Sequence, residues 1–263
     1  MELIVGGEAA YVHTGGRPFD PGTRTMLLLH GAGFDHTAWR HQSRYLAHRG
    51  WSVAAPDFPG HGRSAGGPRA SIAELAEWTC ELLDALDSPD VILVGHSMGA
   101  LVGLEVDDDR VRGRVLLAAS TEIRVHPDLL AHAAEERDDV LALLRAWEHA
   151  SHPGGSPTPG NWMMGEGWRL REGVGLGVLH ADLLACNGYD DGEPSAMGIS
   201  TPVLLVGGAV DRMVAPRATE VLAGVLPDVR QVTLEGAGHA LLLEQPRRVA
   251  RAIEGFGSEI LPA

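Results

Sequence analysis

The chain has 263 residues, of which 44% are hydrophobic and 21% are charged; this composition is typical of globular proteins and excludes global disorder. Its 21 basic and 35 acidic residues give a formal net charge of −14, which repels the phosphates of nucleic acids and anionic membranes. We therefore expect neither nucleic acid nor a membrane among its partners. Two cysteines exclude a disulfide framework and a cysteine-based zinc site.

Residues 1–7 lack the basic stretch and the long apolar run of a secretory signal peptide. No segment approaches the roughly 18 uninterrupted apolar residues that a membrane-spanning helix requires. These features predict a soluble, cytoplasmic protein, and the sequence leaves open whether it is a monomer or a homodimer.

Short apolar runs that are typical of strands alternate along the chain with longer stretches of helical period. Strands are expected at residues 26–29, 51–55, 91–94, 115–119, 203–206 and 231–234. Helices are expected at residues 37–49 and 71–87, and from Pro246 onward. The alternation predicts an α/β fold with a mainly parallel central sheet and helices on both faces.

Residues 121–200 interrupt this alternation, because they carry helical patterning but no expected strand. Amphipathic helices are expected near residues 140–147 and 176–184, and turn residues predict a loop at 152–160. We therefore expect two parts, an α/β core at residues 1–120 and 200–263 and an inserted helical cap at residues 121–199.

Gly95-His96-Ser97-Met98-Gly99 follows the strand expected at 91–94 and precedes a helical stretch, which is the sequence context of a nucleophile elbow. A serine held in such a tight turn needs neighbours without side chains, which Gly95 and Gly99 supply. The turn exposes the hydroxyl and directs the start of the following helix at negative charge that develops beside it. Ser97 is therefore a candidate nucleophile.

Two further residues could activate Ser97, since a serine hydroxyl needs a base to take its proton and a carboxylate to orient that base. Asp211 follows the strand expected at 203–206, and His239 follows the strand expected at 231–234. The carboxyl ends of parallel strands meet at one edge of a sheet, where open α/β sheets place their sites. A turn aspartate and a loop histidine are the alternatives at these two positions.

The order of serine, acid and histidine, together with three further motifs, resembles the α/β-hydrolase superfamily over nearly the whole chain. The motifs are an oxyanion loop at His30-Gly31-Ala32-Gly33, a D-x-P-G-H-G-x-S turn at Asp57-Phe58-Pro59-Gly60-His61-Gly62-Arg63-Ser64, and a closing motif from Gly238-His239 to Glu244-Gln245-Pro246. The spacing from His30-Gly31 to Trp39 resembles a subgroup with a small helical cap, whose members include esterases and hormone receptors.

The resemblance implies that Ser97 is the nucleophile, His239 the base and Asp211 the acid that orients it. It also implies that the backbone N–H groups of Ala32 and Met98 form the oxyanion hole, with Gly33 as the alternative to Ala32. Two convergent N–H donors stabilise the negative oxygen of a tetrahedral intermediate, and the loss of one comparable donor costs about 3–4 kcal/mol. No cofactor is implied.

The connection after Ser97 departs from the family pattern. Fewer residues lie between Ser97 and Arg110 than is usual for members of this family. The intervening helix is therefore short, and Asp107, Asp108 and Asp109 must form the return to the next strand. Acidic residues at the C-terminal end of a helix oppose its dipole, so we expect a less rigid connection there.

Other chemistry has less support. The 13 histidines include no H-E-x-x-H pair, so no metal site is expected, and neither glycine-rich nucleotide-binding motif occurs. His61 and His96 lie inside turn motifs, where we expect structural hydrogen bonds. Cys186 is expected to be a small, buried, hydrophobic residue.

Apolar side chains from the expected cap, joined by two from the core, should line a substrate pocket above Ser97. The candidates are Phe34, Trp147, Trp162, Met163, Met164, Trp168 and Met213. For any single one of them, packing between cap and core is the alternative.

The sequence thus predicts a serine hydrolase for small-molecule substrates, which cleaves carboxylic esters of small to medium, largely apolar compounds through an acyl-enzyme. Other serine-triad enzymes (carbon–carbon hydrolases, lactonases, perhydrolases) are alternatives, as is a slow-turnover ligand sensor of the same fold. Because position 97 is serine, haloalkane dehalogenases and epoxide hydrolases, which use an aspartate nucleophile, are excluded.

Overall fold

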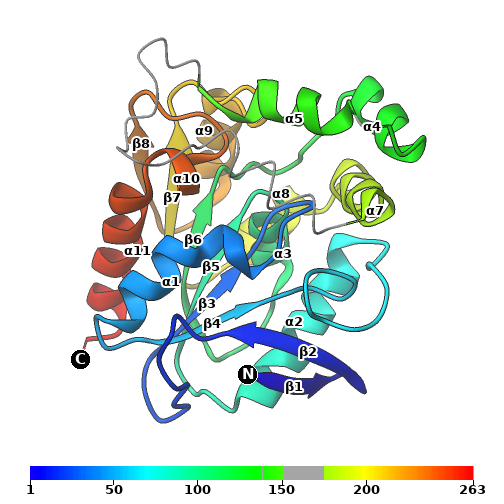
Figure 1. Cartoon of the computed structure of the whole chain (residues 1–263). Helices are drawn as coiled ribbons and strands as arrows, with labels where there is room; N and C mark the ends of the chain where they lie inside the picture. Colours follow the sequence, from blue (N-terminus) through cyan, green and yellow to red (C-terminus); the bar gives the residue numbers. More distant parts are fainter. Residues whose placement is uncertain (138, 151–174, 263) are drawn as a thin grey trace.

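A computed structural model describes residues 1–137, 139–150 and 175–262 of the chain (Figure 1). Within these residues, eight strands form one sheet in the order β1-β2-β4-β3-β5-β6-β7-β8. The strands are β1 (Glu2–Val5), β2 (Glu8–His13), β3 (Thr25–Leu29), β4 (Ser52–Pro56), β5 (Val91–His96), β6 (Val111–Leu117), β7 (Val203–Gly208) and β8 (Val229–Leu234). The pairs β1–β2 and β2–β4 are antiparallel, and every pair from β4 across to β8 is parallel.

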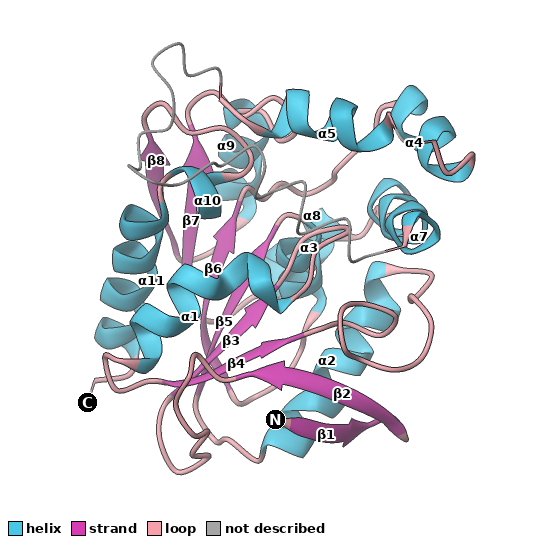
Figure 2. Ribbon diagram, in the orientation of Figure 1, coloured by secondary structure: helices cyan, strands magenta, loops and turns pink. Residues whose placement is uncertain are grey.

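Helices cover both faces of this sheet (Figure 2). The helical segments are η1 (His36–Trp39, a 3₁₀ turn), α1 (Arg40–Ala47), α2 (Ile72–Leu86), α3 (Met98–Glu105), α4 (Pro127–Ala134), α5 (Val140–Glu148), α7 (Leu176–Asn187), α8 (Gly192–Gly198), α9 (Pro216–Val225), α10 (Leu241–Glu244) and α11 (Pro246–Ile260). Helices α1 and α11 contact each other on one face, and α2 and α3 contact each other on the opposite face. Among the helices that the structure describes, none has the length and apolar character needed to cross a membrane.

The central strands are buried on both faces, as strand β3 illustrates. Its Met26 and Leu28 pack into a core with residues of α1 and α11, whereas Leu27 and Leu29 pack into a second core with residues of α2 and α3. Because successive side chains of a strand point to opposite faces, an unbroken apolar run fills two cores at once. The predicted fold, a mainly parallel sheet between two helical layers, is confirmed.

Two elements differ from the expectations. Strands β1 and β2 form an edge hairpin that no expected strand covers, and several of their residues are partly or fully exposed, so they lack the unbroken apolar run of the central strands. The helix expected at residues 37–49 is divided into η1 and α1. The carboxylate of Asp35 caps η1 by accepting a hydrogen bond from the N–H of Thr37 at 2.8 Å.

Helices α4, α5, α7 and α8 lie between β6 and β7 in the chain, and the described residues of this stretch contain no strand. Figure 1 shows α4, α5 and α7 beyond the carboxyl ends of the central strands. A separate apolar cluster joins them through Leu129, Ala133, Val140, Leu144, Leu179 and Leu183. The helices expected near 140–147 and 176–184 lie within α5 and α7, and the loop expected at 152–160 lies outside the described residues.

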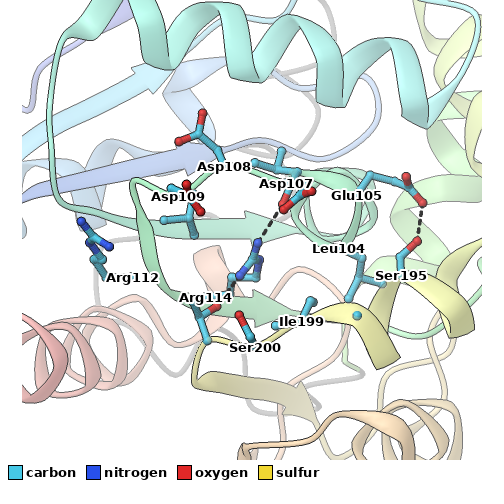
Figure 3. A pocket seen from close by; sticks show the side chains of 14 residues that line it. Leu104, Glu105, Asp107, Asp108, Asp109, Arg112, Arg114, Ser195, Ile199 and Ser200 are labelled. Atoms are coloured by element: carbon cyan, nitrogen blue, oxygen red, sulfur yellow. Dashed lines mark hydrogen bonds between the residues drawn. The ribbon is translucent and has the colours of Figure 1, made fainter.

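The buried side chain of Arg114 offsets the negative charge of the acidic residues that follow α3. The guanidinium of Arg114, which is labelled in Figure 3, lies at the end of the helix. It donates to the carbonyl oxygens of Gly103 at 3.0 Å and Val106 at 2.7 Å, and so caps the helix. Burial lowers the pKa of Arg114 to about 10, while the charge of Asp107 favours its protonated form. The expected conflict between negative charge and the helix dipole is thus offset by a residue further along the chain.

The pocket in Figure 3 has a volume of about 450 Å³ and lies at the end of α3 opposite to Ser97. Residues 104–109 and 198–201 contribute to its lining. It is therefore separate from the carboxyl edge of the sheet, where the candidate residues meet.

Candidate active site

Ser97 lies in the turn between β5 and α3, with φ 53° and ψ −115°. This backbone conformation is strained for a residue with a side chain. A Cβ atom at Gly95 would lie 2.1 Å from the carbonyl oxygen of Gly99, and one at Gly99 would lie 2.4 Å from that of Leu29. Both glycines are therefore required for the turn, as the motif predicts.

The structure brings His239, which follows β8, and Asp211, which follows β7, to Ser97. The Nε2 atom of His239 lies 2.9 Å from the Oγ atom of Ser97, and the Nδ1 atom of His239 lies 2.9 Å from Oδ2 of Asp211. Because a carboxylate only accepts hydrogen bonds, we assign the ring proton to Nδ1, which leaves Nε2 to accept from the Ser97 hydroxyl. The three side chains thus form one continuous hydrogen-bonded chain.

Asp211 is held as a carboxylate. Burial raises its pKa, but the charge and hydrogen bond of His239, together with the N–H groups of Val214 and Met213, bring that pKa below its ordinary value. The two N–H groups donate to Oδ1 at 2.8 Å from Met213 and 2.9 Å from Val214. The other oxygen, Oδ2, is thereby directed at His239.

The backbone around His239 is held from two sides. The Nε2 atom of buried His96 donates to the carbonyl oxygen of His239 at 3.0 Å, which confirms the structural role expected for His96. The buried carboxylate of Glu244 accepts from the N–H of Gly238 at 2.9 Å. The sequence motif contains Glu244, but only the structure shows that its carboxylate accepts from the backbone N–H groups of Gly238 and Ala150.

The two predicted oxyanion donors lie beside Ser97. Met98 is the first residue of α3, and N–H groups in the first turn of a helix have no acceptor within that helix. Ala32 lines the same cavity as Ser97, and a Cβ atom at the preceding Gly31 would lie 3.4 Å from the Cβ of Ser97. Their role as oxyanion donors stays a prediction.

A small cavity of about 20 Å³ adjoins Ser97 and His239. Its other lining residues are Gly31, Ala32, Phe34, His96, Leu144, Glu148, Leu179, Leu183 and Met213. Phe34 and Met213 are pocket candidates from the sequence, whereas Glu148, which is buried, is a carboxylate in a pocket predicted to be apolar. It ends an amphipathic helix, and no motif marks it.

A sequence model of the alpha/beta hydrolase family matches residues 26–252, a range that contains Ser97, Asp211 and His239. The chain belongs to the alpha/beta hydrolase family. The family resemblance inferred from the motifs is therefore confirmed.

Relatives of this α/β-hydrolase carry several hydrolase names. A protein of Variovorax paradoxus named "Putative carbamate hydrolase RutD" is 32% identical over 232 residues, which cover 82% of this chain and 84% of the relative. A pimeloyl-[acyl-carrier protein] methyl ester esterase of Aromatoleum aromaticum is 27% identical over 252 residues, which cover 87% of this chain and 96% of the relative. The crystal structure of an enol-lactonase from Burkholderia xenovorans LB400 superposes with a TM-score of 0.85 at 20% identity, covers 97% of this chain and 99% of that chain, and shows the same fold.

A second, larger groove of this α/β-hydrolase has a volume of about 560 Å³ and shares Met213 with the Ser97 cavity. Trp147, another pocket candidate, lines this groove and not the cavity. The remaining lining residues are Ile123, Arg124, Val125, His126, Pro127, Leu129 and Arg212. Four further candidates lie outside the described residues, namely Trp162, Met163, Met164 and Trp168.

One cluster in the described part of the α/β-hydrolase has ligand atoms within 4.8 Å of one another, formed by Asp35, His36 and Asp57. Asp57 is occupied by the turn that contains it, because it accepts from the backbone and ring N–H groups of His36, both at 2.7 Å, and from the N–H of Arg63 at 2.9 Å. We therefore assign this cluster to the structure of the turn.

Proposed function

We propose that this chain is a serine hydrolase that cleaves carboxylic esters of small to medium, largely apolar substrates by two-step acyl transfer. The observation that carries the proposal is the hydrogen-bonded chain from Ser97 through His239 to Asp211, which ends in a strained turn beside a cavity. The family match and the esterase among the relatives support the same reaction class.

In the first step, Nε2 of His239 takes the hydroxyl proton as Oγ of Ser97 attacks the ester carbonyl. The N–H groups of Ala32 and Met98 donate to the negative oxygen of the tetrahedral intermediate. Asp211 stabilises the imidazolium and keeps its ring oriented. His239 then gives the proton to the leaving alcohol, and the acyl group remains on Ser97.

In the second step, His239 takes a proton from water, which attacks the acyl-enzyme through the same oxyanion geometry. Collapse of the second tetrahedral intermediate returns the proton to Ser97 and releases the acid. The division into a core at 1–120 and 200–263 and a cap at 121–199 belongs to this proposal, because α5 and α7 supply apolar lining of the Ser97 cavity.

Covalent labelling tests the proposal. A fluorophosphonate should phosphonylate Ser97 stoichiometrically, and peptide mass spectrometry should locate the adduct on that residue. The label should block hydrolysis of p-nitrophenyl acetate in proportion to its incorporation. Labelling of another residue, or hydrolysis that survives complete labelling, would contradict the proposal.

A carbamate is the second candidate substrate, favoured by the relative at 32% identity whose name contains that activity. The same machinery would attack either carbonyl and release the same alcohol, so the two candidates differ in the group left on Ser97, which is an acyl group from an ester and a carbamoyl group from a carbamate. Matched substrates, one ester and one carbamate of the same carbon skeleton, distinguish them by their kcat/KM values.

A further inference from the structure

Asp182 lies on α7, in the segment between β6 and β7, and its side chain is 2% exposed. Its Oδ2 atom accepts two hydrogen bonds from different parts of the chain. One comes from the backbone N–H of Gly33 at 2.7 Å, and the other from Nε2 of His61 at 2.8 Å. A single carboxylate thus ties α7 to the predicted oxyanion loop and to the turn at Asp57–Ser64.

The second partner, His61, donates from both ring nitrogens. Its Nδ1 atom donates to the carbonyl oxygen of Pro59 at 3.0 Å, while Nε2 faces Asp182. A carbonyl and a carboxylate both accept, so the ring is protonated and forms a buried ion pair. Burial lowers the pKa of His61, but the charge and hydrogen bond of Asp182 raise it above the ordinary value.

The oxyanion loop itself is fixed one peptide plane at a time. The carbonyl oxygen of Gly31 accepts from Nδ1 of His30 at 2.9 Å and from the N–H of Phe34 at 3.2 Å. These bonds fix the plane that also carries the N–H of Ala32, because a trans peptide directs its N–H opposite to its carbonyl. The next plane, which carries the N–H of Gly33, is fixed by Asp182.

We propose that Asp182 is a positioning residue for the oxyanion hole, and that α7 therefore takes part in transition-state stabilisation without touching the substrate. The inference rests on the proposed function, since it presupposes that the N–H of Ala32 is an oxyanion donor. Ala32 lies between these two peptide planes. Loss of the hydrogen bond from the N–H of Gly33 to Asp182 therefore leaves only the plane on the other side of Ala32 fixed. A loosened donor loses alignment with the oxyanion, and catalysis depends steeply on such alignment.

The test compares two substitutions at position 182 by steady-state kinetics with p-nitrophenyl acetate, normalised to fluorophosphonate-titrated sites. Asp182→Ala removes the acceptor for Gly33 and should lower kcat by tenfold or more, with KM changed by less than threefold. Asp182→Asn keeps an oxygen that can accept from Gly33, so it should recover kcat to within about fivefold of the wild type. Leu184→Ala, at an exposed position of the same helix, is the matched control.

A merely structural role for Asp182 would reduce the titrated sites or raise KM, and would leave kcat per site unchanged. That result, or an equal loss of kcat in the Ala and Asn variants, would overturn the inference. Fluorophosphonate titration of the wild type distinguishes a failure of the proposed hydrolase function from a failure of the role assigned to Asp182. If wild-type Ser97 labels and turns over while Asp182→Ala keeps its kcat, the proposed function stands and only the role of Asp182 fails.

Discussion

Met213 connects Asp211 to the substrate-facing cavities. Its backbone N–H donates to Oδ1 of Asp211 at 2.8 Å, while Met213 itself lines both the 20 Å³ cavity at Ser97 and the 560 Å³ groove beside it. The same residue therefore orients the carboxylate and lines both the small cavity and the larger groove.

Truncation of Met213 should change which esters are accepted. Met213→Ala keeps the backbone bond to Asp211 but truncates a residue that lines both spaces, so longer acyl chains should reach the groove. We expect the ratio of kcat/KM for p-nitrophenyl octanoate over acetate to rise about tenfold, which is typical for a change of pocket size. Met197→Ala, at a residue that is 61% exposed, should leave the ratio unchanged.

An unchanged chain-length profile in Met213→Ala would show that acyl chains do not enter the groove. A fall in kcat for all esters, with the profile retained, would instead show that the side chain supports the orientation of Asp211.

Asp211→Asn should impair the orientation and tautomer of His239 without unfolding the protein. The amide oxygen can take the place of Oδ1, which accepts from Met213 and Val214, but the NH₂ group then faces His239. Nδ1 of His239 must accept, so Nε2 carries the proton and cannot take one from Ser97. The comparable substitution in a serine protease lowers kcat by about 10⁴-fold, and we expect a similar loss here.

Thermal unfolding provides the control for Asp211→Asn, since its melting temperature should stay close to that of the wild type. A variant that retains more than a tenth of the wild-type kcat would contradict the role assigned to Asp211.

Buried neutral histidines make stability depend on pH. Burial and the neighbouring His239 lower the pKa of His96 from 6.5 to about 4. Between these values the unfolded chain binds a proton that the folded protein excludes, so the free energy of unfolding should fall as pH drops from 6.5 to about 4. The pKa of His30 is lowered to about 3, mainly by burial, and adds to this fall. His61, whose pKa is raised, acts in the opposite direction.

Urea denaturation at a series of pH values measures this dependence. His96→Gln removes one of the titrating groups, so its unfolding free energy should fall less steeply than that of the wild type between pH 6.5 and about 4. Parallel curves for the two proteins would show that His96 is protonated in the folded state.

Much of the fold and of the site could be predicted, because the buried strands and the tight turn at Ser97 each require a residue pattern that is local in the sequence. Strand β5 is buried on both faces and therefore needs an unbroken apolar run, and the turn at Ser97 has no room for side chains at Gly95 and Gly99. Both requirements are visible as local patterns in the sequence. Asp211 and His239 could be found because parallel strands bring their carboxyl ends to one edge.

The remaining parts depend on contacts between segments that are distant along the chain. Arg114 caps α3 from β6, and Asp182 reaches Gly33 from a helix that is 149 positions away in sequence. Glu148 enters the cavity at the end of an amphipathic helix that shows no sign of a functional residue. No local period or motif encodes such contacts, so they emerge only from the folded chain.

The hydrolysis of p-nitrophenyl acetate by Ser97→Ala tests the central claim most directly. If the Oγ atom of Ser97 is the nucleophile, kcat should fall by about 10⁵-fold or more, while circular dichroism and the melting temperature stay near those of the wild type. Ser258→Ala, near the end of α11, should retain full activity. Turnover by folded Ser97→Ala within tenfold of the wild-type rate would contradict the account.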